Sequence, residues 1–194
     1  MDSRAIWDAE APTFDDEPDH GLGDETTRDA WRALLLGVLP PTPTKVADLG
    51  CGTGTLSVLL AEEGYAVDGV DVSPEMVARA RAKADAAGVA ADLRVGDANE
   101  PDLDPAKYDV VLSRHVLWAM DDPAAALQRW LALLRPGGLL VLVEGCWSTG
   151  AGISSDRAVS LVRATGRDAE LRRLPEAVYW GKEITDDRYL VVSH

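Results

Sequence analysis

The sequence has 194 residues, enough for one domain with a full hydrophobic core, and its 46% hydrophobic and 27% charged residues are ordinary for a soluble globular protein. The formal net charge of −14 repels phosphate backbones and therefore argues against a nucleic acid partner. No apolar run approaches the ~20 residues needed to span a membrane, and the acidic N-terminus lacks the apolar centre of a signal peptide. We expect a cytoplasmic protein with no membrane partner; the oligomeric state is not readable.

The cysteines and histidines indicate no metal site. Two cysteines are too few for a disulfide framework or a zinc site. The three histidines, His20, His115 and His194, are not spaced like metal ligands.

The first part of the chain, residues 1–40, predicts a short helical cap or lid. Residues 11–25 are rich in Pro, Asp and Gly and predict a loop. Residues 26–39 predict a helix, with Thr26 and Asp29 as a capping box. A proline-rich seam at residues 39–45 then separates this cap from a ligand-binding domain at residues 41–194.

Strand-like and helix-like runs alternate after the seam. Alternation of this kind predicts an α/β fold, with a mostly parallel sheet covered by helices on both faces. Ligands of such sheets bind beyond the carboxyl ends of the strands. The predicted strands are residues 45–50, 65–72, 91–98, 108–114, 139–145, 169–174 and 188–193, and the predicted helices are residues 55–64, 73–88, 121–138 and 154–166.

The stretch "VADLGCGTG" places glycines at 50, 52 and 54 directly after the first of these strands. They let the backbone turn sharply and approach a ligand. The dinucleotide pattern G-x-G-x-x-G fails in both registers, because Thr55 and Ser57 stand where its third glycine should be. Asp48 would also repel a pyrophosphate. A cationic ligand without phosphates, such as S-adenosylmethionine, suits this turn better.

Two further acids follow the next two strands. Asp71 can accept both hydroxyls of a ribose, and Asp97 can accept a hydrogen bond from an adenine amino group. Met76 can cover a face of the purine, and Ala98 can offer a backbone contact. Each has a plainer alternative: Asp48 as a turn cap, Asp71 as a helix-start acid, Asp97 as a solvated acid and Met76 as core.

Five stretches in order, "VADLGCGTG", "VDGVDVSPEM", "GDAN", "YDVVLSRHVLWAMDDP" and "LRPGGLLVLVEG", resemble a class I S-adenosylmethionine-dependent methyltransferase. The sequence is most similar to the small-molecule group that includes the ubiquinone and menaquinone methyltransferases. The resemblance implies a Rossmann-like, seven-stranded sheet of order 3-2-1-4-5-7-6 whose last strand is antiparallel. The cofactor contacts that we expect are Asp48, Gly50, Cys51, Gly52, Gly54, Asp71, Val72, Met76, Asp97, Ala98, Ser113 and Arg114.

Two histidines and four aromatic residues are candidates for the acceptor side of the site. His115 follows the fourth strand and His20 lies in the acidic loop, and either could remove a proton or be merely hydrogen-bonded or solvated. The expected pocket walls, which could also be core residues, are Trp7, Phe14, Trp118 and Trp147. Trp130 lies on a helical stripe and should be core.

These features predict an enzyme that transfers a methyl group to a small-molecule O, N or C nucleophile by in-line displacement, mainly through positioning. "SRHV" stands where nucleic-acid amino methyltransferases carry [ND]-P-P-[FY], and there is no long insertion for a polymer. Two alternatives stay open: an NAD-dependent oxidoreductase, and a non-catalytic protein that binds S-adenosylmethionine.

Overall fold

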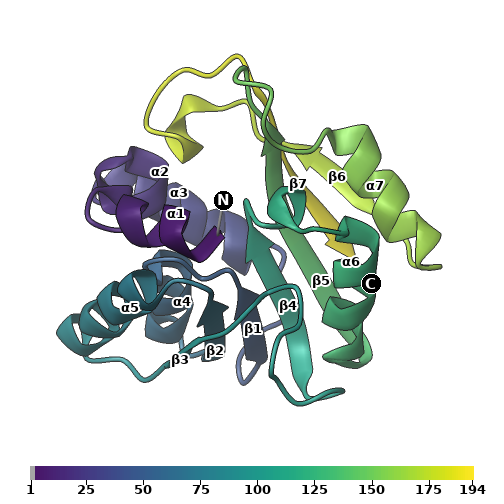
Figure 1. The fold of residues 1–194 in the computed structure, drawn as a ribbon, viewed down its shortest axis with the longest axis horizontal. Coiled ribbons are helices and arrows are strands. Elements are labelled where there is room, and N and C mark those ends of the chain that lie inside the picture. The colour runs from purple at the N-terminus through teal and green to yellow at the C-terminus, as the bar shows by residue number, and fades with distance from the viewer. Residues whose placement is uncertain (1–2) are drawn as a thin grey trace.

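A seven-stranded sheet forms the centre of the computed structural model, which describes residues 3–194 (Figure 1). Its order is β3-β2-β1-β4-β5-β7-β6. Strands β1 to β5 pair in parallel, and β7 runs antiparallel between β5 and β6. The predicted strand order and antiparallel last strand are therefore confirmed.

The strands lie close to their predicted positions. They are β1 (Lys45–Leu49), β2 (Ala66–Asp71), β3 (Asp92–Val95), β4 (Tyr108–Arg114), β5 (Leu134–Cys146), β6 (Glu170–Arg173) and β7 (Asp187–Ser193). β5 begins before the predicted residue 139 because Leu134 already pairs with Tyr108, ahead of a register shift. The first five strands all point their carboxyl ends to one edge of the sheet, so groups that follow them gather there.

The N-terminal segment is more helical than predicted. It holds α1 (Ser3–Glu10), the 3₁₀ turn η1 (Phe14–Asp16), α2 (Pro18–Gly21) and α3 (Glu25–Leu36). The prediction of a plain loop over residues 11–25 was thus wrong. The predicted capping box was wrong too, because Asp24 accepts the hydrogen bond from Thr27 N at 2.8 Å. Asp24 is a good N-cap, and it lies two residues before the first residue of the box that we predicted.

The remaining helices cover the sheet. They are α4 (Thr55–Glu62), α5 (Pro74–Ala87), η2 (Leu117–Ala119), α6 (Pro123–Ala132), α7 (Ser155–Ala164) and η3 (Ala177–Tyr179). Ser73 caps α5 through Met76 N at 3.1 Å. Gly88 ends it in the left-handed conformation, as such positions favour.

Two apolar cores lie on the two faces of the sheet. One joins α3 and α4 to the sheet and includes Trp31, Leu59 and Val110. The other joins α6 and α7 to the opposite face, with Trp130 and Val162 against Val111 (Figure 1). Trp130 is fully buried, as predicted for a core residue. Neighbouring residues of β4 thus serve opposite cores, which is the alternation of a strand covered on both faces.

The N-terminal segment is fastened to the edge where the parallel strands end. Asp8 accepts a hydrogen bond from Ser73 Oγ at 2.5 Å, and Asp15 accepts one from Thr53 Oγ1 at 2.5 Å. The division of the chain into a cap (residues 1–40) and a ligand-binding domain (residues 41–194) remains a prediction. Residues 1 and 2 of that cap lie outside the described residues. Within residues 3–194, no helix combines the length and apolar character that crossing a membrane requires.

Candidate active site

The glycine turn after β1 requires glycine for steric reasons. Gly50 and Gly54 have φ of +73° and +75°. A Cβ on Gly50 would lie 2.3 Å from Val116 Cγ2, and one on Gly54 would lie 2.7 Å from Ala80 Cβ. The turn thus packs tightly against two neighbouring elements, with no room for side chains.

Asp48 and Asp71 hold the ends of β1 and β2 around this turn. Asp48 is 3% exposed and accepts a hydrogen bond from Ser57 Oγ at 2.6 Å. Burial raises its pKa to about 6. Asp71 accepts hydrogen bonds from the backbone N–H groups of Gly52 and Ser73, both at 2.9 Å. Burial also raises the pKa of Asp71.

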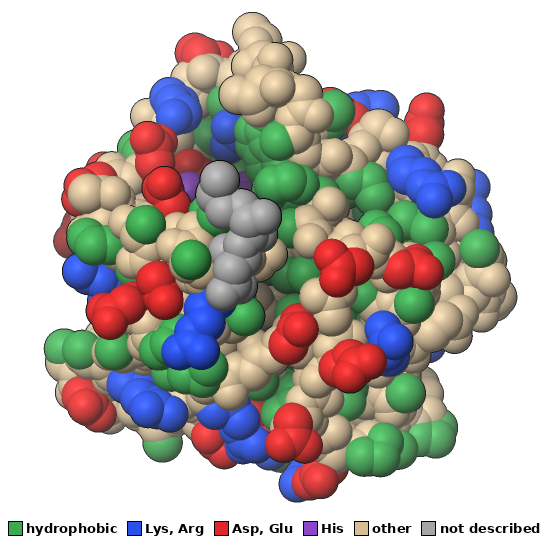
Figure 2. Space-filling view, viewed as in Figure 1, with side chains coloured by type: hydrophobic (Ala, Val, Ile, Leu, Met, Phe, Trp, Pro, Cys, Tyr) green, Lys and Arg blue, Asp and Glu red, His purple; other side chains and the backbone are tan. Residues whose placement is uncertain are grey.

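A cavity of about 610 Å³ opens at this edge of the sheet. Its volume suits a small-molecule site. Figure 2 shows the hollow beside α1, with hydrophobic side chains and a histidine in its wall. Of the sequence-predicted site residues, those that line it are Trp7, Phe14, His20, Asp48, Gly50, Cys51, Gly52, Asp71, Val72, Met76, Asp97, Ala98, Arg114, His115, Trp118 and Trp147.

Two predicted contacts do not line the cavity. Gly54 is the N-cap residue before α4 and faces Ala80 of α5, so its role is to allow close helix packing. Ser113 is fully buried in β4, and its Oγ has no hydrogen-bond partner among residues 3–194. Sequence position alone could not distinguish these two from their cavity-facing neighbours.

The histidines meet from opposite sides of the cavity. His115 follows β4 with φ of +59°, and its Nε2 is buried with no hydrogen-bond partner in the described chain. His20 stacks on Phe14 with ring centroids 4.2 Å apart. Burial, with the nearby Arg114 charge, lowers the pKa of His20 and places that of His115 well below its ordinary value. Both rings are therefore neutral near pH 7.

Aromatic rings wall the space beside His115. The ring of Trp147 lies 5.1 Å from that of His115 and 5.6 Å from that of Trp118, between centroids. Trp118 Nε1 donates to the His115 carbonyl at 2.9 Å. This donation satisfies the indole N–H within the wall itself, so the exposed ring surfaces offer an apolar contact to a ligand.

The sequence did not predict two of the residues that line the cavity, Asp19 and Arg188. Asp19, on α2, is 4% exposed, and Arg188, on β7, is 8% exposed. Their charged atoms, Asp19 Oδ2 and Arg188 Nη1, are 3.6 Å apart. Arg114 also reaches α2, since its Nη1 donates to the Asp19 carbonyl at 2.6 Å. No motif marks Asp19 or Arg188, because only the folding of α2 and β7 onto β4 brings them to the cavity.

Glu144 supports the turn that carries His115. It is fully buried in β5, and its Oε1 accepts hydrogen bonds from Val116 N at 3.0 Å and Leu117 N at 2.7 Å. Burial raises its pKa to about 8. The residue thus fixes the backbone after β4 without lining the cavity.

The sequence is similar to those of known methyltransferases. Residues 47–142 match a family described as a methyltransferase domain. The ubiquinone biosynthesis O-methyltransferase of Xanthomonas axonopodis pv. citri (strain 306) is 33% identical over 137 residues, which are 70% of this chain and 54% of that protein. The chain belongs to the class I S-adenosylmethionine-dependent methyltransferases. It spans about half the length of the curated relatives that it matches.

Solved structures share the fold of this chain. The [4+2]-cyclase SpnF aligns with a TM-score of 0.74 at 19% identity, over 85% of this chain and 79% of that one. The magnesium protoporphyrin IX methyltransferase of Synechocystis PCC 6803, with bound S-adenosylhomocysteine, aligns with a TM-score of 0.68 at 22% identity, over 91% and 86%. At these identities the likeness shows the fold alone.

Proposed function

We propose that this chain transfers the methyl group of S-adenosylmethionine to an O, N or C nucleophile of a small molecule. One observation carries the proposal: carboxylates at the ends of β1, β2 and β3 (Asp48, Asp71 and Asp97) line a single cavity of about 610 Å³, together with Gly50 and Gly52 of the glycine turn. Acids beside a bare backbone turn favour a cationic nucleoside over a pyrophosphate.

The adenosine half of the cofactor fits the end of the cavity near α5. Asp71 is held by two backbone N–H groups and still lines the cavity, so it can accept ribose hydroxyls. Asp97 is fixed by an Asx turn to Asn99 N at 2.8 Å, beside Ala98. Met76 is 1% exposed and also lines the cavity, where it can pack on the purine.

The methionine half fits between Asp48 and Arg114. Asp48 lines the cavity and can oppose the ammonium group, and the Arg114 guanidinium can oppose the carboxylate. When bound, S-adenosylmethionine supplies an activated sulfonium methyl group. The protein's share is then mainly to hold the acceptor in line with that group.

His115, His20 and the tryptophans form the acceptor side. Trp118 and Trp147 offer an apolar wall for an aromatic acceptor. Neutral imidazoles at His115 and His20 can receive a proton if the nucleophile must lose one. Trp7 and Phe14 contact each other edge-to-face over the cavity, as expected of a lid.

The test is product formation from S-adenosylmethionine with a deuterated methyl group, incubated with the protein and a panel of phenols, amines and carboxylic acids. We expect mass spectrometry to detect a methylated product, together with S-adenosylhomocysteine in equal amount. Binding of S-adenosylmethionine with no product from the panel or from cell extract would favour the non-catalytic alternative. The matched control is Asp71→Asn, which should form little product.

A further inference from the structure

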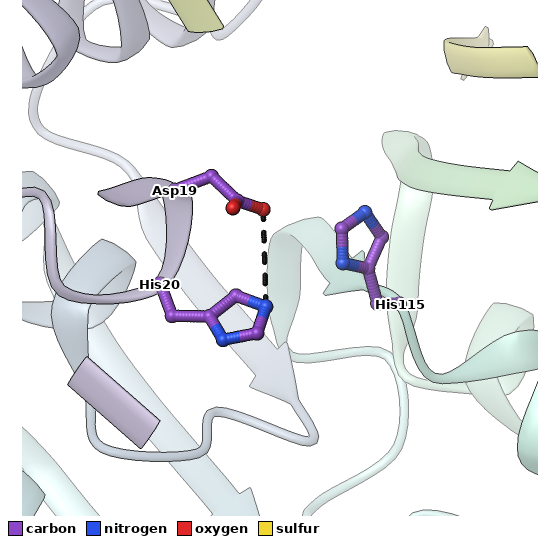
Figure 3. Close-up of side chains that lie close together, drawn as sticks. All are labelled: Asp19, His20 and His115. Carbon is purple, nitrogen blue, oxygen red and sulfur yellow. Dashed lines mark ion pairs between the residues drawn. The ribbon is translucent and has the colours of Figure 1, made fainter. Parts of the chain in front are cut away.

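Three side chains with metal-binding atoms meet in the cavity. Asp19, His20 and His115 each place one such atom so that all three lie within 4.8 Å of one another. Figure 3 shows the two residues of α2 facing His115 across one space. Asp19 and His20 are adjacent, but His115 follows about 95 residues later, so the sequence showed no metal-ligand spacing.

The hydrogen bond of His20 decides which of its nitrogens faces this space. His20 Nδ1 lies 3.2 Å from the carbonyl oxygen of Phe14. A carbonyl only accepts, so Nδ1 carries the hydrogen and the neutral ring presents a lone pair at Nε2. That nitrogen is 3.8 Å from Asp19 Oδ2, too far for a hydrogen bond.

The space between the three residues is therefore electron-rich. The His20 nitrogen and the Asp19 oxygen both offer lone pairs, with no hydrogen between them in the neutral ring. His115 Nε2 is also without a hydrogen-bond partner in residues 3–194. A cation placed among the three side chains could take a lone pair from each, whereas a hydroxyl group has one hydrogen to give.

We propose that Asp19, His20 and His115 bind a divalent first-row transition-metal ion. Two imidazoles and one carboxylate are a set that such ions take, and a histidine whose other nitrogen donates to a backbone carbonyl is a typical ligand. Magnesium and calcium prefer oxygen ligands and suit the site less well. All three residues line the cavity, so a bound ion would be accessible from it. With the ion bound, the His20 lone pair is occupied, so the base role proposed above for this residue applies to the metal-free chain.

The three side chains must move closer together to bind one ion. Ligand atoms ~2.1 Å from a tetrahedral zinc ion lie about 3.4 Å apart. The 3.8 Å between His20 and Asp19 must therefore shorten by a few tenths of an ångström, and the other pairs, which lie within 4.8 Å, by up to about 1.4 Å. Asp19 is held to Arg114 through its carbonyl, so its carboxylate, which pairs with Arg188, remains available as a ligand.

The positive charge of Arg188 disfavours a metal cation at this site, because Arg188 already pairs with Asp19. Its Nη1 is 3.6 Å from Asp19 Oδ2, and its Nη2 is 3.4 Å from Asp186 Oδ2. Asp186 gives the guanidinium a second carboxylate when a metal takes the first. Arg188 and Arg114 must nonetheless weaken metal binding, and they favour a negatively charged ligand at the open positions.

The test is calorimetric titration of the EDTA-stripped full-length chain with Zn²⁺, and with Co²⁺ as a spectroscopic probe. We expect one equivalent to bind, with Co²⁺ absorption typical of nitrogen and oxygen ligands rather than thiolates. Asp19→Asn, His20→Ala and His115→Ala should each weaken binding at least ~10-fold. His194→Ala is the matched control, and it should bind as the wild type does.

A variant that is expected to strengthen Zn²⁺ binding distinguishes a metal site from a merely structural cluster. Arg188→Gln removes the competing cation and should tighten Zn²⁺ binding several-fold. The proposal is overturned if the wild type binds no better than a His20→Ala/His115→Ala double variant, or if Arg188→Gln leaves Zn²⁺ affinity unchanged. Neither readout requires methyl transfer, so the result is independent of the proposed activity.

Discussion

The carboxylate of Asp71 accepts a hydrogen bond from the backbone N–H of Gly52 at 2.9 Å, and this contact ties the end of β2 to the glycine turn after β1. The same carboxylate accepts from Ser73 N, at the start of α5. One acid thus joins three elements at the edge where the cofactor should bind. The Asp71 carboxylate therefore both holds the glycine turn in place and offers a negative charge at the expected cofactor site.

Asp71→Asn should weaken S-adenosylhomocysteine binding by about 10- to 100-fold, since an amide cannot reproduce both acceptor oxygens and leaves a buried donor poorly paired. Isothermal titration measures the loss. Asp85→Asn, an exposed acid on α5, is the control and should bind normally. Equal affinity in the two variants would mean that Asp71 does not hold the ribose.

Gly50→Ala should lower the free energy of unfolding much more than Gly88→Ala. Both glycines have positive φ, but a Cβ at 88 meets nothing within 4 Å, whereas one at 50 would lie 2.3 Å from Val116 Cγ2. Gly88→Ala should therefore cost about 1 kcal/mol of backbone strain alone. Urea unfolding of both variants gives the comparison, and similar losses would show that Val116 yields easily.

Glu144 makes the stability depend on pH in an unusual direction. Its pKa rises from 4.5 to about 8 on folding, so the folded chain keeps a proton that the unfolded chain releases. This contribution to stability is fully present below pH 4.5 and is lost as pH rises through about 8.

Glu144→Gln should remove that dependence, because the amide oxygen can still accept from Val116 N and Leu117 N without a charge. Relative to the wild type, the variant should gain stability between pH 6 and pH 9, as measured by urea unfolding at the two values. A parallel change in both proteins would contradict the raised pKa of Glu144.

His115→Asn should slow methyl transfer without abolishing it. Asparagine tolerates the positive φ of this position but cannot take up a proton. If His115 acts as a base, turnover should fall ~100-fold while the affinity for S-adenosylhomocysteine stays within about twofold. Unchanged turnover, compared with His194→Asn as control, would remove His115 from the chemistry.

Local patterns predicted much of the fold. Ser73 and Gly88 bounded α5 correctly. The sheet order, which the family resemblance implied, is also the observed one. Most of the predicted cofactor residues line one cavity because they follow successive strands of a parallel sheet.

The features that the sequence did not predict depend on packing between elements that are far apart in the chain. α2 is four residues long, and it is linked to β4 and β7 through the contacts of Asp19 with Arg114 and Arg188, so a Pro- and Asp-rich stretch indicated only a loop. Asp19 and Arg188 carry no local signal of burial, since charged side chains are usually exposed. Gly54 and Ser113 belong to the right segments, but their direction relative to the cavity follows from strand and helix packing.

The most direct measurement is titration of the wild-type chain with S-adenosylhomocysteine and with NADH, followed by quenching of the cavity tryptophans. We predict saturable quenching by S-adenosylhomocysteine, weakened in Asp71→Asn, and no saturable quenching by NADH, whose pyrophosphate would lie against Asp48. Tighter binding of NADH than of S-adenosylhomocysteine would contradict the account.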